Sequence, residues 1–141
     1  MYKKILLAVD LGDPDTSRRG VAAAVELARL AQADIRLVTV QSVTPMAFMD
    51  YVPADIDARI REYAGAELAK GAAALDYPKE RVSTALRFGG VYSEVLAEAE
   101  EWGADLIVVG SHRPSMSTYL LGSNAKTIVR HAKCSVLVAR G

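Results

Sequence analysis

Short apolar runs alternate with longer amphipathic segments along the whole chain. Strands buried on both faces are predicted by the nearly continuous apolar runs Ile5–Val9, Ile35–Val40, Leu106–Val109 and Val136–Ala139. The run Val82–Arg87 alternates more between apolar and polar residues, which suits a strand at the edge of a sheet.

The segments between these runs carry apolar residues at helical spacing. The segment from Thr44 to Asp55 contains two prolines and is expected to be a loop. Helices are expected from Ser17 to Ala31, from Asp55 or Asp57 to Tyr77, from Gly90 to Gly103, and behind Gly122-Ser123-Asn124.

Strict alternation of strands and helices predicts one α/β domain over residues 1–141. We expect a single open five-stranded parallel sheet in the order 3-2-1-4-5, with helices on both faces. Ligands of such sheets bind beyond the carboxyl ends of the strands, where the strand order reverses. The reversal falls between the first and fourth strands, which end at Asp10 and Gly110.

The loop behind the fourth strand has the chemistry of an anion site. It runs from Gly110 to the small-residue turn Gly122-Ser123-Asn124, and the spacing of the apolar residues behind that turn, Ala125, Ile128, Val129 and Ala132, predicts a helix. A helix N-terminus offers free N–H groups and a positive dipole end, and glycine lets the backbone approach a phosphate. The pattern predicts a phosphate-binding loop of a nucleotide site.

The composition argues against a disordered, a nucleic-acid-binding and a membrane protein. The 141 residues are 51% hydrophobic and 24% charged, which is typical of a globular protein. Lys+Arg and Asp+Glu both number 17, so no net charge favours nucleic acid or an anionic membrane. The apolar run before Asp10 is too short for a signal sequence, and no stretch reaches membrane-spanning length. We expect a cytoplasmic protein that binds neither nucleic acid nor membrane.

Several enzyme signatures are missing from the sequence. There is no Gly-x4-Gly-Lys-Ser/Thr loop, and Leu11-Gly12-Asp13-Pro14 stands where a dinucleotide fingerprint would follow the first strand. No pair of nucleophile and base is evident, so no catalytic residue is predicted. The single Cys134 and the two histidines do not have metal-ligand spacing, so no metal ligand is predicted.

The chain resembles the universal stress protein family over nearly its whole length. The resemblance rests on a Lys-Ile-Leu-Leu-Ala-Val-Asp opening, a Val-Thr-Val second strand, Gly-Ala-Asp-Leu-Ile-Val-Val-Gly, Leu-Leu-Gly-Ser and a Val-Arg-His-Ala-x-Cys-x-Val-Leu-Val ending. The loop Gly-Ser-His-Arg-Pro-x-x-Ser-Thr-Tyr-Leu-Leu-Gly-Ser-Asn-Ala is similar to that of the enterobacterial F/G-type branch. In the nucleotide-binding branch the loop reads Gly-x2-Gly-x9-Gly-Ser/Thr. Here Arg113 replaces the middle glycine, and the interval to Gly122 is one residue shorter.

The resemblance implies an adenine nucleotide alpha hydrolase-like fold and an ATP site. Asp10 takes the position that contacts the nucleoside, and the backbone of Val40 takes the position that addresses the adenine. Gly110 approaches the sugar-phosphate, while Gly122, Ser123 and Asn124 hold the phosphates. The full set expected to contact the nucleotide is Ala8, Asp10, Val40, Val109, Gly110, His112, Arg113, Gly122, Ser123 and Asn124.

Structural roles compete with these assignments at several positions. Asp10 could cap the first helix or the turn that leads to it instead of accepting ribose hydroxyls, and Arg113 could be a solvated surface charge instead of a phosphate ligand. His112 is expected to pack on the ligand or bond the loop backbone. For Ser123 and Asn124, helix capping and anion binding use the same N–H groups, so the two roles overlap.

The resulting hypothesis is an ATP-binding stress-response protein in which nucleotide shifts oligomer or partner affinity. Any Mg²⁺ or Mn²⁺ would be held mainly by the phosphates. The resemblance also implies a homodimer, or a higher oligomer such as a tetramer, paired through Val136–Ala139. The alternatives are a slow ATPase or phosphotransferase, and a nucleotide-free dimeric interaction module.

Overall fold

The computed structural model describes residues 1–42, 46–51, 53–110 and 123–140. For Met46, Phe48, Met49 and Ser123 it describes the backbone alone. In this part of the chain one five-stranded parallel sheet has the order β3-β2-β1-β4-β5, which confirms the predicted order and the edge position of the third strand. The strands are β1 (Lys4–Ala8), β2 (Asp34–Gln41), β3 (Val82–Phe88), β4 (Leu106–Gly110) and β5 (Ser135–Ala139).

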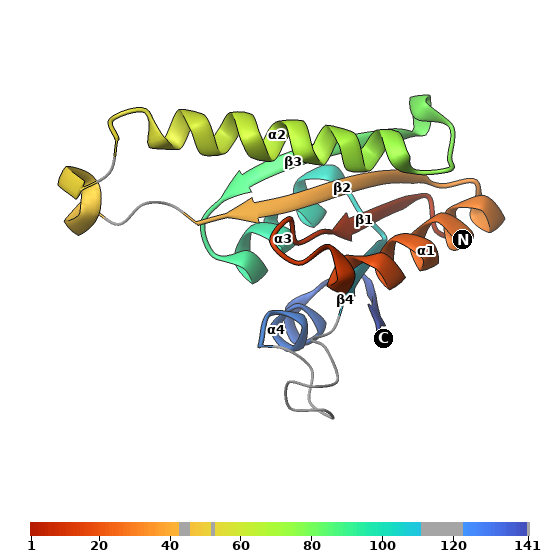
Figure 1. Cartoon of the computed structure of the whole chain (residues 1–141). Coiled ribbons are helices and arrows are strands. Elements are labelled where there is room, and N and C mark those ends of the chain that lie inside the picture. Colours follow the sequence, from red (N-terminus) through yellow and green to blue (C-terminus); the bar gives the residue numbers. More distant parts are fainter. Residues whose placement is uncertain (43–45, 52, 111–122, 141) are drawn as a thin grey trace.

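Helices cover both faces of the sheet (Figure 1). One face packs against α1 and α2, and the other against α3 and α4. Short 3-10 helices lie before α2 and before β3. Within the described residues the helices are α1 (Pro14–Ala31), η1 (Met46–Tyr51), α2 (Ile56–Ala74), η2 (Lys79–Arg81), α3 (Val91–Trp102) and α4 (Ser123–His131). None of them is long and apolar enough to cross a membrane.

The central strand β1 supplies the middle of both cores. Ile5, Leu6 and Leu7 are completely buried. Because successive side chains of a strand point to opposite faces, Ile5 and Leu7 pack toward α1 and α2, while Leu6 packs toward α3 and α4. A continuous apolar run is therefore required at β1, as the sequence pattern indicated.

The amino end of β1 is fixed to both of its neighbours. The backbone N–H of Asp34 donates to the carbonyl of Lys3, and the N–H of Asp105 donates to the carbonyl of Lys4. The Asp105 carboxylate in turn accepts the N–H groups of Lys3 (2.9 Å) and Lys4 (3.1 Å). These bonds fix the register of β2 and β4 against β1 where each strand begins.

Some helix boundaries differ from the expectation. The first helix begins at Pro14 instead of Ser17, because the fixed φ of proline suits a first helical turn, where its missing N–H costs nothing. The segment expected to be a loop contains η1. Among the apolar residues whose spacing predicted the last helix, Ile128 is buried and Val129 beside it is 45% exposed. The α3 helix ends at Gly103 in the left-handed region (φ 81°), as predicted.

Gly110 is required by packing at the end of β4. A Cβ atom there would lie 2.2 Å from the backbone carbonyl oxygen of Thr16, in the first turn of α1. The absence of a side chain therefore lets α1 lie directly against the end of β4. This contact joins the two chain segments that border the reversal of strand order.

Alanine at position 110 is expected to destabilise the fold. Gly110→Ala should lower the free energy of unfolding by about 1–3 kcal/mol, because the Thr16 carbonyl must move. Gly65→Ala, in the middle of α2 with nothing within 4 Å of its added Cβ, is the matched control and should gain about 0.4–1 kcal/mol. Urea unfolding followed by circular dichroism measures both. Equal stabilities of the two variants would contradict the packing role of Gly110.

Candidate functional site

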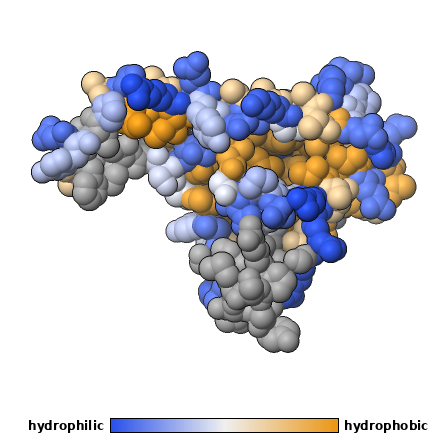
Figure 2. Space-filling model, viewed as in Figure 1, coloured by the Kyte–Doolittle hydropathy of each residue, from blue (hydrophilic) through white to orange (hydrophobic). Residues whose placement is uncertain are grey.

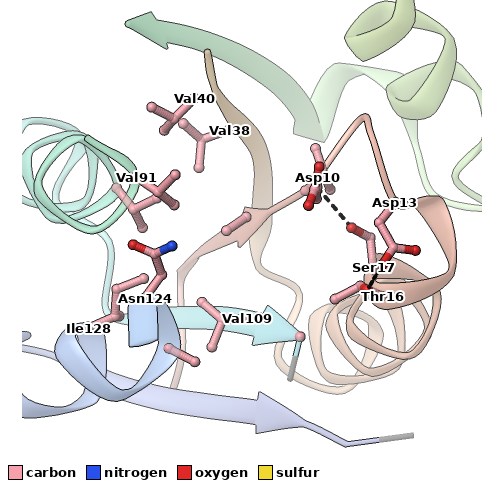
Figure 3. Close-up of a pocket in the computed structure, with 15 residues that line it drawn as sticks. Asp10, Asp13, Thr16, Ser17, Val38, Val40, Val91, Val109, Asn124 and Ile128 are labelled. Carbon is pink, nitrogen blue, oxygen red and sulfur yellow. Dashed lines mark hydrogen bonds between the residues drawn. The ribbon is translucent and has the colours of Figure 1, made fainter. Parts of the chain in front are cut away.

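A cavity of about 400 Å³ opens at the carboxyl ends of β1 and β4, where the strand order reverses. Its walls come from β1, β2 and β4, from the first turns of α1, α3 and α4, and from the turn between β1 and α1 (Figure 3). The position is the one that the topology predicted.

The cavity brings together most of the described residues that were predicted to bind nucleotide. Those that line it are Ala8, Asp10, Val40, Val109, Gly110 and Asn124. Ser123 is the first residue of α4, and its side chain lies outside the described part. The predictions for His112, Arg113 and Gly122 fall outside the described residues.

One end of the cavity is acidic and hydroxylated. Oδ1 of Asp10 accepts the backbone N–H of Gly12 (2.9 Å), and the backbone N–H of Asp10 donates to Oγ of Ser17 (3.0 Å). Oδ2 of Asp13 accepts the hydroxyl of Thr16 (2.6 Å). The Asp10 carboxylate thus organises the turn before α1, as its structural interpretation predicted, and it also borders the cavity (Figure 3).

The opposite wall is apolar. Val38 and Val40 project from β2, Val91 from the first turn of α3 and Ile128 from α4 (Figure 3). Val95, on the next turn of α3, also lines the cavity. Their side chains offer dispersion contacts and almost no hydrogen bonds. Such a wall suits a flat, largely apolar group such as a purine base.

The third side of the cavity is the N-terminus of α4. The Asn124 amide lies among the apolar residues at this end (Figure 3). The first turn of α4 has no acidic residue, whereas Asp13 and Asp15 lie at the N-terminus of α1. Since free N–H groups and the helix dipole favour anions, the α4 end is the electrostatically favourable place for a phosphate and the α1 end is not.

Sequence reasoning missed the part of the cavity wall that comes from side chains distant in the chain. Val38 follows from Val40 by the two-residue period of a strand, and Val95 from Val91 by the four-residue period of a helix. The face of α3 that carries Val91 and Val95 points to the end of β2 because of tertiary packing. The sequence pattern contains no signal for this packing.

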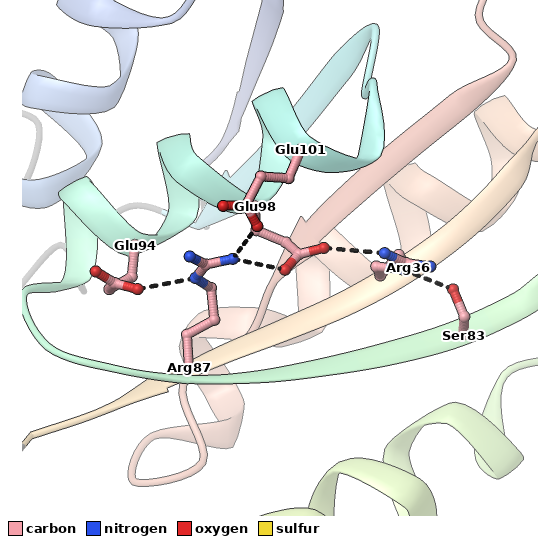
Figure 4. A network of polar contacts seen from close by, with 6 residues as sticks. All are labelled: Arg36, Ser83, Arg87, Glu94, Glu98 and Glu101. Carbon is pink, nitrogen blue, oxygen red and sulfur yellow. Dashed lines mark hydrogen bonds and ion pairs between the residues drawn. The ribbon is translucent and has the colours of Figure 1, made fainter.

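A polar network holds α3 against the sheet beside this wall (Figure 4). On β3, Arg87 donates to Glu94 (2.8 Å), Glu98 (3.0 Å) and Glu101 (2.9 Å), which lie on successive turns of α3. The hydrogen bonds that Arg87 donates to Glu101 and Glu94 raise the pKa of its guanidinium above the ordinary value. Glu98 is only 7% exposed.

The same network reaches the second strand. The second oxygen of Glu98 accepts Nη1 of Arg36 (2.9 Å), and Nε of Arg36 donates to Oγ of Ser83 (2.9 Å). The Arg36 guanidinium lies 4.6 Å from the centre of the Trp102 ring. The buried Glu98 carboxylate thus joins β2 and β3 to α3, the helix that supplies Val91 and Val95 to the cavity.

The remaining residues with reactive or metal-binding side chains, Cys134 and His131, lie outside the cavity in the described part of the chain. No three His, Cys, Asp or Glu side chains gather there to hold a metal ion. Cys134 is half-buried, and burial raises the pKa of its thiol. His131 is exposed in the last turn of α4, where a basic side chain suits the helix dipole.

Comparison with known proteins gives consistent matches over the whole chain. The model of the universal stress protein family matches residues 1–140. The chain is similar to universal stress protein G of Shigella flexneri, with 36% identity covering 99% of this chain and 100% of that protein. It is also similar to the solved universal stress protein UspA of Lactobacillus plantarum (TM-score 0.75, 23% identity, covering 99% and 98% of the two chains). A universal stress protein solved in complex with cAMP has a TM-score of 0.64 and 25% identity, covering 98% and 96%.

Removing the buried carboxylate of Glu98 should lower the free energy of unfolding far more than removing the exposed carboxylate of Glu101. Glu98→Ala leaves Arg36 and Arg87 without their shared acceptor and should lower the free energy of unfolding by roughly 1.5–3 kcal/mol. Glu101→Ala, at a side chain that is 67% exposed, should cost less than about 1 kcal/mol. Urea unfolding of both variants measures the difference. A Glu98→Ala variant as stable as Glu101→Ala would contradict the role of the network.

Proposed function

Because the chain belongs to the universal stress protein family, a family of stress-response proteins, we propose that it binds ATP in the cavity at the strand reversal. The observation that carries this proposal is the polarity of that cavity. It has an acidic, hydroxylated end at Asp10, an apolar wall on β2 and α3, and a helix N-terminus without acidic residues at α4. These surfaces complement a ribose, a base and a phosphate chain, respectively.

We assign the ribose to the end formed by Asp10. A carboxylate accepts hydroxyl hydrogen bonds well but repels phosphate, and one Asp10 oxygen already holds the turn at Gly12. The base lies against Val40 and the α3 wall, while Ala8, Val109 and Gly110 form the floor of the site. This arrangement directs the phosphates toward α4.

We assign the phosphates to Asn124, Ser123 and Gly122, with Arg113 supplying a cation and His112 packing nearby. The support is the position of α4 at the cavity and the sequence of the loop before it. A guanidinium replaces the close backbone approach of a glycine with charge. Mg²⁺ or Mn²⁺ would be held mainly by the phosphates, and the chain contributes binding and orientation, with no catalytic residue assigned.

A solved relative in complex with cAMP supports an adenine nucleotide as the ligand class. ATP and cAMP differ at the phosphate end, which is where the α4 N-terminus lies. Isothermal titration of the purified protein with ATP, AMP and cAMP therefore distinguishes them. We expect ATP to bind more tightly than AMP and cAMP. If cAMP binds more tightly than ATP, the ligand of the site is cAMP and the ATP assignment is wrong. If none of the three nucleotides binds, the nucleotide site itself is refuted.

We propose that the nucleotide acts by changing assembly in the cytoplasm. β5 is the last strand in the sheet order, and its residues Val136 to Ala139 are half-buried in the single chain. An antiparallel pairing of two β5 strands about a two-fold axis would form an isologous homodimer. Nucleotide can shift this equilibrium, or that of a higher oligomer or partner complex, only if it binds the two states with different affinity.

Removing the Asp10 charge should weaken nucleotide binding without disturbing the turn. In Asp10→Asn the amide oxygen can still accept the Gly12 N–H, while the acceptor for ribose loses its charge. We expect ATP and AMP to bind about tenfold more weakly, and free adenine to be unaffected. Asp15→Asn, on α1 outside the cavity, is the control and should bind as the wild type does. A folded Asp10→Asn variant with unchanged ATP affinity would exclude the ribose assignment.

A charge on the β5 edge should prevent the dimer. Val138→Lys places a lysine from each protomer near the proposed two-fold axis, where like charges repel. We expect light scattering to show a dimer for the wild type and a monomer for Val138→Lys. Thr84→Lys puts the same charge on the other edge strand, at an exposed position of β3, and should remain dimeric. The proposal fails if the wild type is monomeric, or if only Thr84→Lys dissociates it.

A further inference from the structure

A second cavity, of about 350 Å³, lies between α1 and α2 on the opposite face of the sheet. Val21 of α1 and Leu68 of α2 form its sides, and Leu37 of β2 forms its floor. Figure 2 shows hydrophobic surface along this part of the molecule, between α2 and α1. The volume falls within the range of small-molecule sites, which starts at about 300 Å³.

The space exists because the two helices stay apart. While α3 and α4 pack on each other, α1 and α2 are packed much less closely. Small residues face the gap, namely Ser17 on α1 and Gly71 and Ala74 on α2. A Cβ at Gly71 would project to 3.5 Å from Cδ2 of Leu37, so the missing side chain of Gly71 directly enlarges the cavity.

The charge at this cavity has one sign. Among the described residues that line it, Asp10 and Glu67 carry carboxylates and none is lysine or arginine. Oε2 of Glu67 lies 3.3 Å from Nζ of Lys70, whose side chain is 77% exposed, so this pairing is made in solvent and is weak. A cationic group of a ligand can therefore replace Lys70 at little cost, whereas an anion would meet two carboxylates.

We propose that the α1/α2 cavity binds a small amphiphile with one apolar chain and a cationic head. The chain lies along Val21, Leu37 and Leu68, and the head lies at the carboxylate of Glu67, with Asp10 at the border of the same cavity. Burial of the chain supplies most of the affinity, and the carboxylates select the sign of the head group. The two cavities share Val9, Asp10 and Ser17 at their common border. The inference does not rest on the proposed ATP site, because Val21, Leu37 and Leu68, which hold the chain, lie on the other face of the sheet and do not line the first cavity.

A matched pair of probes tests the ligand class. Octyltrimethylammonium and octyl sulfate have the same chain and opposite charges, and both are used below their micelle concentrations without nucleotide. Titration followed by methyl NMR should give saturable shifts at Leu37, Leu68 and Val21 for the cation. We expect the sulfate to bind about two- to fivefold more weakly or not at all. Shifts spread over the surface, or equal affinity for both probes, would overturn the proposal.

Two substitutions on α2 test the location. Gly71→Leu fills the cavity and should weaken the cationic probe about tenfold or more, whereas Gly65→Leu, whose added Cβ meets nothing within 4 Å, should leave it unchanged. If Gly71→Leu does not fold, Gly71→Ala serves, because its Cβ makes an ordinary contact with Leu37 and should give a smaller loss.

The charge is tested separately on the same helix. Glu67→Gln should weaken the cation about two- to fivefold, and Glu62→Gln, exposed on α2 outside the cavity, should have no effect. Equal affinity in Gly71→Leu and Gly65→Leu places the probe elsewhere and overturns the proposal. ATP binding measured on the same variants reports on the other cavity, so failure of one proposal is distinguishable from failure of the other.

Discussion

The position of β1 between β2 and β4 is the constraint on which the rest of the structure depends. A strand with parallel neighbours on both sides and helices on both faces buries its central side chains, which must then be apolar, and Ile5, Leu6 and Leu7 satisfy this condition. The chain leaves β1 toward one side of the sheet and later returns to the other side. The connections therefore diverge at the carboxyl end of β1, and the space between them becomes the candidate site.

The walls of that site are held by interactions of different kinds. On one side, hydrogen bonds within the turn at Asp10 fix backbone and carboxylate together. On the other side, the apolar wall belongs to α3, whose position depends on the buried Glu98 and the two arginines of the strands below it. The apolar surface that we assign to a base is thus supported by a charged network that never touches the cavity.

The sequence predicted those parts of the fold and site that depend on local pattern. Apolar runs located the strands, and the position of strand ends led to Asp10 and Gly110, because the reversal rule needs only the order of the strands. It did not predict Val91 and Val95 as cavity residues, since their facing depends on how α3 packs on β2 and β3. The spacing that includes Val129 predicted the helix α4, but it did not show that Val129 is 45% exposed, because spacing locates an apolar stripe and not its outer margin. The assignments of His112, Arg113 and Gly122 stay predictions.

Gly110, at the end of β4, can be explained by packing against α1 or by the close approach of a nucleotide. The two explanations lead to different conclusions about whether the glycine indicates a ligand. The oxygen atom that excludes a side chain there belongs to the protein itself, 2.2 Å from the point where a Cβ would stand. Selection for an intact fold would keep this glycine in a descendant that had lost every ligand. Its presence in a nucleotide motif is therefore weak evidence for a nucleotide, and the informative positions are those that the folded chain could change freely.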